Sequence, residues 1–290
     1  MLLLQFLITG LATGALYALI ALGFVLVYRT SRVVNFAVGE FLLVGAYLTY
    51  TLALLMPLPL ALLVAVPAAF LFGVLVERVF VRPLLGRNLV AVIMATIGLV
   101  VTLQGGVQLI WGPDQKYLSG TLPDLTVQVG GFALPSRSVW YLMIGVLLCA
   151  WLVYLLRKSR YGVLVRAVSE SETAALALGI NAPRVVGAVW GLSAALAALG
   201  GGLLALAGGV GFHLAALGLK VFPVAILGGM DSVAGVLVAG LLLGVVESFS
   251  MLYLESRFAG ITEAVPFLIV LLVLLFRPQG IFGQGRIERL

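Results

Sequence analysis

The stretch FLITGLATGALYALIALGFVLVY, residues 6–28, decides the fold class because it carries no charge and is long enough to cross a bilayer as one helix. It exceeds the apolar core of about 7–15 residues in a secretory signal, and no basic segment precedes it, so we expect a retained first span. Comparable stretches recur along the chain, in which 63% of residues are hydrophobic and 10% are charged. The sequence therefore predicts an all-α polytopic membrane protein, with residues 1–290 as a single transmembrane domain.

Nine apolar segments can be drawn as membrane crossings. They cover residues 6–28, 33–55, 60–81, 89–111, 139–156, 185–209, 214–229, 233–254 and 262–277. Boundaries taken from hydropathy shift by several residues, so we expect about eight to ten transmembrane helices.

Two of these crossings are interrupted. Residues 33–55 open with the polar and small sequence NFAVGE, and residues 214–229 are too short for the hydrocarbon core and contain a proline and two glycines. Short, interrupted segments in both halves of a membrane chain are typical of a translocation path near the midplane, although kinked packing helices would give the same pattern. The candidate path or gate residues are Asn35, Gly39, Glu40, Pro223, Gly228 and Gly229.

Basic residues are divided unequally between the connections of the nine segments. Thirteen of the seventeen lysines and arginines fall in one set of connections, and the other set contains only Lys116, Arg137, Lys220 and Arg257. Because cytoplasmic connections carry the excess of basic residues, we expect the first set in the cytoplasm. The amino terminus and a loop at residues 112–138 are then outside, and the carboxyl terminus is inside. The net charge of +6 reflects this orientation and predicts no nucleic-acid partner.

The external loop at residues 112–138 has a local pattern of its own. Its residues 125–129, LTVQV, alternate in strand fashion, and FAL follows a pair of glycines. This pattern predicts a small β-hairpin that is too short to be a separate domain.

The cytoplasmic connection at residues 156–184 is long and rich in charge. Within it, residues 169–178 have alanine and leucine at helical spacing and two glutamates in the first turn, where the helix dipole favours them. Gly179 suits the end of this helix, and Asn181 suits the cap of the next span. A short, stiff helix predicts a docking element for a cytoplasmic partner, and a solvated amphipathic linker is the alternative. The candidate docking residues are Ser171, Glu172, Ala174, Ala175, Leu178 and Gly179.

Glu40 and Glu247 are carboxylates that lie away from the ends of expected spans, where an ionised group costs a few kcal/mol. Ser248 and Ser250 lie beside Glu247, so we interpret Glu247 as protonated or hydrogen-bonded between helices. For Glu40 two interpretations are equally supported: a protonated or hydrogen-bonded carboxyl group between helices, and a carboxyl group that faces a polar path.

Motifs for catalysis are missing from the sequence. It contains no Gly-x-x-x-x-Gly-Lys-Ser/Thr phosphate loop, no His-Glu-x-x-His and no Gly-x-Ser-x-Gly elbow. One cysteine, Cys149, and one histidine, His213, predict neither a disulfide framework nor a histidine-rich metal site. We therefore expect a chain that is no enzyme and holds no cofactor, and any ATPase that drives it is a separate chain.

Four motifs, in order along the chain, resemble those of a known family. They are NFAVGE with GAY at residues 35–47, RAV and AA…LGIN at 166–181, VAILGG at 224–229 and RPQGIFG at 277–283. The one visible departure is Val38, where the family often has histidine. The resemblance covers essentially the whole chain and is to the H-type permease subunits of branched-chain amino acid ABC importers.

This resemblance implies a permease domain in a bacterial or archaeal cytoplasmic membrane, surrounded by membrane lipid. It implies a paralogous M-type permease as partner, two cytoplasmic ABC ATPases docked on the predicted helix, and an extracytoplasmic solute-binding protein that delivers branched-chain or other hydrophobic amino acids. The family also includes urea and short-amide importers, whose H-type permeases commonly carry an added amino-terminal region. Two alternatives from other classes are a self-sufficient channel or secondary transporter, with Glu40 and Glu247 as ion-site candidates, and a membrane-embedded enzyme, for which no nucleophile is evident.

Overall fold

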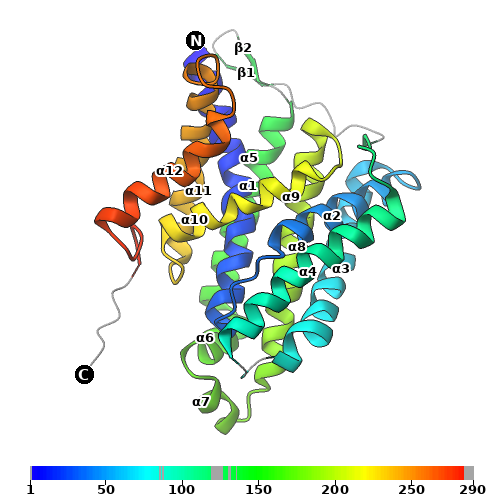
Figure 1. Cartoon of the computed structure of the whole chain (residues 1–290), viewed down its shortest axis with the longest axis vertical. Coiled ribbons are helices and arrows are strands. Elements are labelled where there is room, and N and C mark those ends of the chain that lie inside the picture. The colour runs from blue at the N-terminus through cyan, green and yellow to red at the C-terminus, as the bar shows by residue number, and fades with distance from the viewer. Residues whose placement is uncertain are drawn as a thin grey trace. The chain divides into compact units, whose positions relative to one another are not determined.

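A computed structural model describes residues 2–84, 86, 88–118, 127–129, 132–134 and 136–283 (Figure 1). Parts of the predicted 112–138 loop lie outside these residues, as do the basic residues Arg87, Arg286 and Arg289. The chain divides into two compact units, which we call unit 1 and unit 2. Unit 1 comprises residues 1–25, 124–150 and 220–290, and unit 2 comprises residues 26–123 and 151–219. That residues 1–290 act as one domain stays a prediction.

Helices make up most of both units, and α1 and α5 each contribute to both. Unit 1 contains the first part of α1 (Leu2–Ser31), β1 (Val127–Val129), β2 (Phe132–Leu134), the first part of α5 (Ser136–Lys158), α10 (Val221–Gly228), α11 (Val233–Tyr253) and α12 (Ile261–Phe276). Unit 2 contains the last parts of α1 and α5, with α2 (Val38–Ala53), α3 (Leu58–Val76), the π-helical turn η1 (Glu77–Val81), the 3-10 turn η2 (Arg82–Leu84), α4 (Leu89–Trp111), α6 (Arg160–Glu170), α7 (Glu172–Ala177), α8 (Ala182–Gly208) and α9 (His213–Leu219). Strands β1 and β2 pair antiparallel, which confirms the predicted hairpin.

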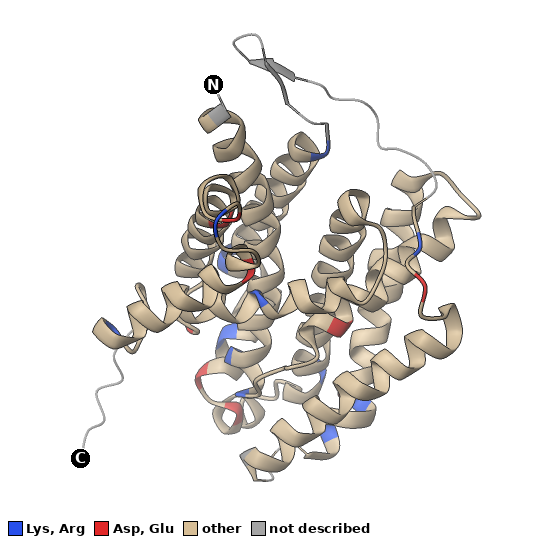
Figure 2. Cartoon of the chain, turned by 45° about the horizontal axis from the view of Figure 1, so that its top comes forward, with Lys and Arg blue, Asp and Glu red and all other residues tan. Residues whose placement is uncertain are grey.

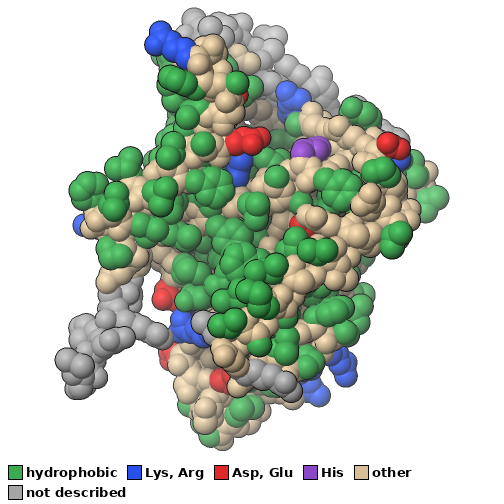
Figure 3. All heavy atoms as spheres, viewed as in Figure 1, with side chains coloured by type: hydrophobic (Ala, Val, Ile, Leu, Met, Phe, Trp, Pro, Cys, Tyr) green, Lys and Arg blue, Asp and Glu red, His purple; other side chains and the backbone are tan. Residues whose placement is uncertain are grey.

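Six helices of the described chain are long and apolar enough to cross a membrane. They are Leu3–Ser31, Leu58–Leu84, Val90–Trp111, Arg137–Lys158, Ala182–Gly208 and Val233–Tyr253. Three shorter apolar stretches, Val38–Ala53, His213–Gly228 and Ile261–Phe276, match the remaining expected segments. Few charged residues lie on the ribbon (Figure 2), and hydrophobic side chains cover much of the face in Figure 3. The protein is therefore an all-α polytopic membrane protein with short segments, as predicted.

The two interrupted crossings differ in detail from the expected spans. The chain is not helical over residues 32–37, so α2 begins at Val38 instead of residue 33. The crossing drawn at 214–229 is two helices, α9 and α10, with Lys220 between them in the chain. Pro223 explains this break, because in one continuous helix its ring would clash with the carbonyl group four residues earlier.

Small residues allow close helix packing inside each unit. In unit 2, a Cβ atom added to Gly73 of α3 would lie 2.6 Å from the carbonyl oxygen of Trp190 in α8. In unit 1, a Cβ atom added to Gly14 of α1 would lie 2.6 Å from the carbonyl oxygen of Gly240 in α11. Without water to drive association, such backbone approach is a main source of helix–helix stability in lipid.

Candidate functional site

A buried asparagine shapes the irregular segment before α2. Asn35 is fully buried, and its Oδ1 accepts a hydrogen bond of 3.0 Å from the amide of Ala37. This local bond gives the backbone an alternative to helical pairing, which is why α2 starts late. Within the described part of the chain, Nδ2 of Asn35 has no hydrogen-bond partner. Among the residues described here, a buried donor therefore lies without an acceptor at the entrance to α2.

Glu40, in the first turn of α2, is paired with a neutral side chain. It is only 3% exposed, and its Oε1 accepts a hydrogen bond of 2.9 Å from the Nε2 atom of Gln104 in α4. Its Oε2 has no partner among the described residues. Since a buried carboxylate costs free energy unless it is bonded, the Glu40–Gln104 pair is a polar contact that the surrounding apolar helices must accommodate.

Gly39 brings α2 into backbone contact with α9. A Cβ atom added to Gly39 would meet the carbonyl oxygen of Ala215, and one added to Gly218 would meet the Cα atom of Gly39. Neither position accepts a larger side chain unless one of the helices moves. The predicted residues Gly39 and Glu40 thus lie together in unit 2, on a contact that involves α2, α4 and α9.

The three predicted residues of α10 shape the two ends of that helix. Pro223 is buried in the first turn, where a missing amide costs no helical hydrogen bond. A Cβ atom added to Gly228 would lie 2.5 Å from the amide nitrogen of Val236 in α11, and Gly229 ends α10 with φ of +89°. These residues belong to unit 1, whereas the three predicted residues around α2 belong to unit 2. A shared role in one path stays a prediction.

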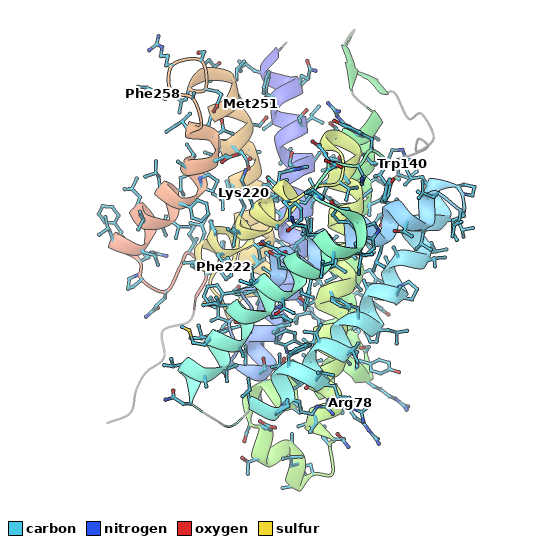
Figure 4. All side chains as sticks on the ribbon, turned by 45° about the vertical axis from the view of Figure 1, so that its right-hand side comes forward. Arg78, Trp140, Lys220, Phe222, Met251 and Phe258 are labelled. Atoms are coloured by element: carbon cyan, nitrogen blue, oxygen red, sulfur yellow. The ribbon has the colours of Figure 1, made fainter. Side chains whose placement is uncertain are left out.

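An ion pair inside the apolar helices of unit 1 was not predicted. Lys220, labelled in Figure 4, places its Nζ atom 2.5 Å from the Oε1 atom of Glu247 in α11. Their side chains are 8% and 16% exposed, and the hydroxyl of Tyr17 in α1 donates to the same oxygen at 3.4 Å. The interhelical hydrogen bond expected for Glu247 is therefore present, but the assignment of Lys220 to an external connection is wrong.

The sequence did contain a signal for this pair. Lys220 lies inside residues 214–229, which were themselves drawn as a crossing. A lysine in a membrane helix requires a partner, and an intramembrane carboxylate such as Glu247 is the natural choice. Lys220 therefore needed an anionic partner from the start, because it lies inside a membrane segment and not in a connection.

A second ion pair, between Glu77 and Arg82, lies at the end of α3 and was also missed. Glu77 is fully buried, and the guanidinium group of Arg82 donates to its two oxygens at 2.7 and 3.1 Å. Arg82 also donates to the carbonyl oxygen of Pro183 at 3.0 Å. This two-pronged contact ties the end of α3 to the start of α8.

The loop between α5 and α8 contains two short helices, each capped by a serine. Oγ of Ser159 accepts a hydrogen bond from the amide of Gly162 at 3.1 Å, and Oγ of Ser171 accepts one from the amide of Ala174 at 3.2 Å. The helix predicted at residues 169–178 is therefore divided at Ser171. The backbone of Ser171 is extended, so this residue ends α6 and caps α7 instead of lying inside one helix.

The end of α7 agrees with the prediction. Gly179 has φ of +80°, and the amides of Gly179 and Ile180 bond to the carbonyl groups of Leu176 and Ala175, each at 3.0 Å. These two bonds form the Schellman motif that glycine favours. The side chain of Asn181 caps α8, as was also predicted.

Exposure separates the predicted docking residues into two kinds. Ser171, Glu172, Ala174, Leu178 and Gly179 are exposed, whereas Ala175 is 1% exposed and holds α7 against its own chain. Leu176, which the sequence reasoning did not select, is 50% exposed and adds an apolar side chain to α7. The docking role itself stays a prediction.

Apolar membrane helices with buried polar pairs and a capped helix in a polar connection define this chain as a polytopic membrane protein. The model of a family described as the permease component of branched-chain amino acid transport systems matches residues 6–275. The chain belongs to this family.

Individual relatives are similar over nearly their whole length. The high-affinity branched-chain amino acid transport system permease protein BraD of Pseudomonas aeruginosa is 34% identical over 99% of this chain and 97% of its own. The high-affinity branched-chain amino acid transport system permease protein LivH of Escherichia coli (strain K12) is 33% identical over the same shares. A probable branched-chain amino acid transport permease protein LivH of Methanocaldococcus jannaschii is 30% identical over 92% of this chain and 89% of its own.

Proposed function

We propose that this chain is the membrane permease subunit of an ATP-driven importer for branched-chain or other hydrophobic amino acids. The observation that carries the proposal is the end-to-end similarity to BraD and LivH, whose names state that they are permease proteins of branched-chain amino acid transport systems. The similarity covers the interrupted segments and the connection at α6 and α7 alike, which supports the same role for the whole chain.

The proposed complex contains a paralogous permease, two cytoplasmic ATPases and an extracytoplasmic solute-binding protein. A separate ATPase is required because the sequence has no phosphate-binding loop. The exposed face of α7 supports docking of the ATPase. Hydrogen-bonded caps at both ends keep this six-residue helix rigid, so it can move as one body. Orientation by the excess of basic residues puts α7 in the cytoplasm, the amino terminus outside and the carboxyl terminus inside.

In this proposal the residues around α2 and α10 form part of the path for the amino acid. Asn35 and Glu40 supply buried polar atoms without partners in the described chain, and irregular backbone at membrane depth is tolerated only beside protein or water. Gly39 and Gly228 allow the close helix contacts that a gate needs in order to shut without leaking.

The decisive experiment is leucine uptake into proteoliposomes that contain the complex co-purified with this chain. We expect uptake that requires ATP and the solute-binding protein. Uptake without ATP would identify a channel or secondary transporter instead, and uptake of urea or short amides but not of leucine would move the chain to that branch of the family.

Docking on α7 is tested by a pair of matched substitutions. Ala174→Trp places a bulky group on the exposed face of α7 and is expected to release the ATPases from the purified complex. Ala91→Trp, at an exposed alanine of α4, is the control and is expected to retain them. Equal retention of the ATPases by both variants would contradict the docking role.

A further inference from the structure

An apolar cavity of about 370 Å³ opens in unit 2 beside α6. Its wall is built from α1, α3, α5, α6 and α8, and includes Phe70, Leu155 and Leu192. The volume lies within the range of about 300–1,000 Å³ that is typical of small-molecule sites. An empty apolar space loses the contacts of its lining, so an apolar group that enters this cavity is stabilised.

The cavity has one charged residue in its lining, and that residue lies at one end. Arg184, Ala188 and Leu192 are four residues apart on α8, so they follow one face of the helix. At a rise of 1.5 Å per residue, this strip is about 12 Å long. Arg184 is exposed and in the first turn of α8, whereas Leu192 lies two turns deeper. A cation at the rim and an apolar interior match an amphiphile with an anionic head.

Further basic residues lie next to the rim in the sequence. Leu155 and Leu156 line the cavity, and the exposed Arg157 and Lys158 follow them directly at the end of α5. Arg160 then begins α6, whose Tyr161 also lines the cavity. Basic pockets between membrane helices are the kind of site that binds anionic lipid headgroups.

We propose that this cavity binds one acyl chain of an anionic phospholipid, with the lipid phosphate at Arg184. The bound lipid fixes α6, and α6 shares its last cap, Ser171, with α7. An anionic lipid in the cavity therefore supports the helix that we assign to ATPase docking. This last consequence rests on the proposed function, but lipid binding itself does not.

Lipid retention by the purified full-length chain tests the proposal without any measurement of transport. The chain is equilibrated in mild detergent with phosphatidylglycerol or phosphatidylcholine of the same acyl chains, and bound lipid is counted by native mass spectrometry. We expect one retained phosphatidylglycerol in preference to phosphatidylcholine. Arg184→Gln should weaken that retention about fivefold, which is the effect of one basic side chain at an anionic surface. Ala188→Trp should abolish retention of both lipids by filling the cavity.

Two control variants separate the site from general effects. Arg78→Gln removes the same charge from an exposed residue that does not line the cavity, and Ala91→Trp adds the same bulk to an exposed alanine of α4. Both should bind phosphatidylglycerol as the unaltered chain does.

Three results would overturn the proposal. The first is equal retention of the two lipids by the unaltered chain. The second is equal retention of phosphatidylglycerol by Arg184→Gln and Arg78→Gln. The third is displacement of the lipid when the ATPases are added, which would show that a segment of the partner occupies the cavity. If Ala188→Trp fails to fold, the two arginine variants still decide. Unchanged lipid retention together with failed leucine uptake would refute the proposed function and leave the lipid site standing.

Discussion

Glu40 in unit 2 and Glu247 in unit 1 are both carboxylates inside apolar helices, and the two regions accommodate them in different ways. Glu247 meets the ammonium group of Lys220 at 2.5 Å, whereas the hydrogen-bond partner of Glu40 among the described residues is the carboxamide of Gln104 at 2.9 Å. A cation balances the charge, but an amide supplies a single hydrogen bond. The region of Glu247 should therefore depend on charge, and the region of Glu40 on hydrogen bonding and close packing.

Breaking the ion pair of unit 1 should have the largest effect. Lys220→Met leaves Glu247 as a buried carboxylate without its cation, and removal of one partner from a buried pair costs about 3–5 kcal/mol. We expect a large fall in the unfolding temperature of the purified protein, measured by a thermal melt in detergent.

The double substitution Lys220→Met with Glu247→Gln is the control for that prediction. It removes both charges and leaves an amide that can still accept a hydrogen bond from Tyr17. We expect the double variant to recover most of the lost stability, because replacing both partners of a buried pair is often neutral. A double variant as unstable as Lys220→Met would contradict a charge-dependent role.

The next largest effect should come from Gly39, which tests close packing beside Glu40. Gly39→Leu forces a side chain against the carbonyl group of Ala215, and overpacking of this kind costs about 1–3 kcal/mol. Gly98→Leu in α4 is the matched control, because a Cβ atom there meets nothing within 4 Å. We expect lower thermal stability and lost uptake for Gly39→Leu alone, and equal uptake by the two variants would argue against a tight α2–α9 contact at the path.

The contrast between the two regions also shows what the sequence reveals. Hydropathy predicts the apolar spans because the bilayer requires each spanning segment to satisfy its own backbone. Local chemistry predicts the stop at Gly179 and the cap at Asn181, since both act on residues within one or two turns.

Spacing along the chain did not identify the partners of the two carboxylates. Gln104 lies 64 residues from Glu40, and Lys220 lies 27 residues from Glu247, so neither pairing follows from spacing. The division of the helix predicted at 169–178 is a local error of another kind. The sequence Ser171-Glu172 is compatible with one continuous helix and with a cap that starts a new helix. Packing against the rest of the chain decides which of the two forms.

Removing the amide partner of Glu40 should have a smaller effect than removing the cation partner of Glu247. Gln104→Leu leaves Oε1 of Glu40 without its donor, and an unsatisfied buried acceptor costs about 1–3 kcal/mol. Gln108→Leu, one helical turn further along α4, is a control of the same chemistry. The thermal melt should show a lower unfolding temperature for Gln104→Leu but little change for Gln108→Leu. Equal unfolding temperatures for both variants would show that the hydrogen bond to Glu40 does not contribute to stability.

The smallest effect is expected for Glu40→Gln, which sharpens the comparison most directly. The new carboxamide keeps an oxygen where Oε1 accepts the hydrogen bond from Gln104, and it adds an N–H₂ group where Oε2 has no described partner. Because no cation lies opposite Glu40 in the described contacts, loss of the carboxylate leaves no charge uncompensated. We expect a smaller loss of thermal stability than for Gln104→Leu, because the hydrogen bond from Gln104 is kept and one buried polar group replaces another at the position of Oε2. Uptake of leucine should likewise be retained.

The same change at position 247, Glu247→Gln, should be markedly destabilising because it leaves the buried ammonium group of Lys220 without its carboxylate partner. If Glu40→Gln abolished uptake while leaving the melt unchanged, the carboxylate of Glu40 would be a direct contact of the transported solute and the two regions would have to be compared by function instead of by stability.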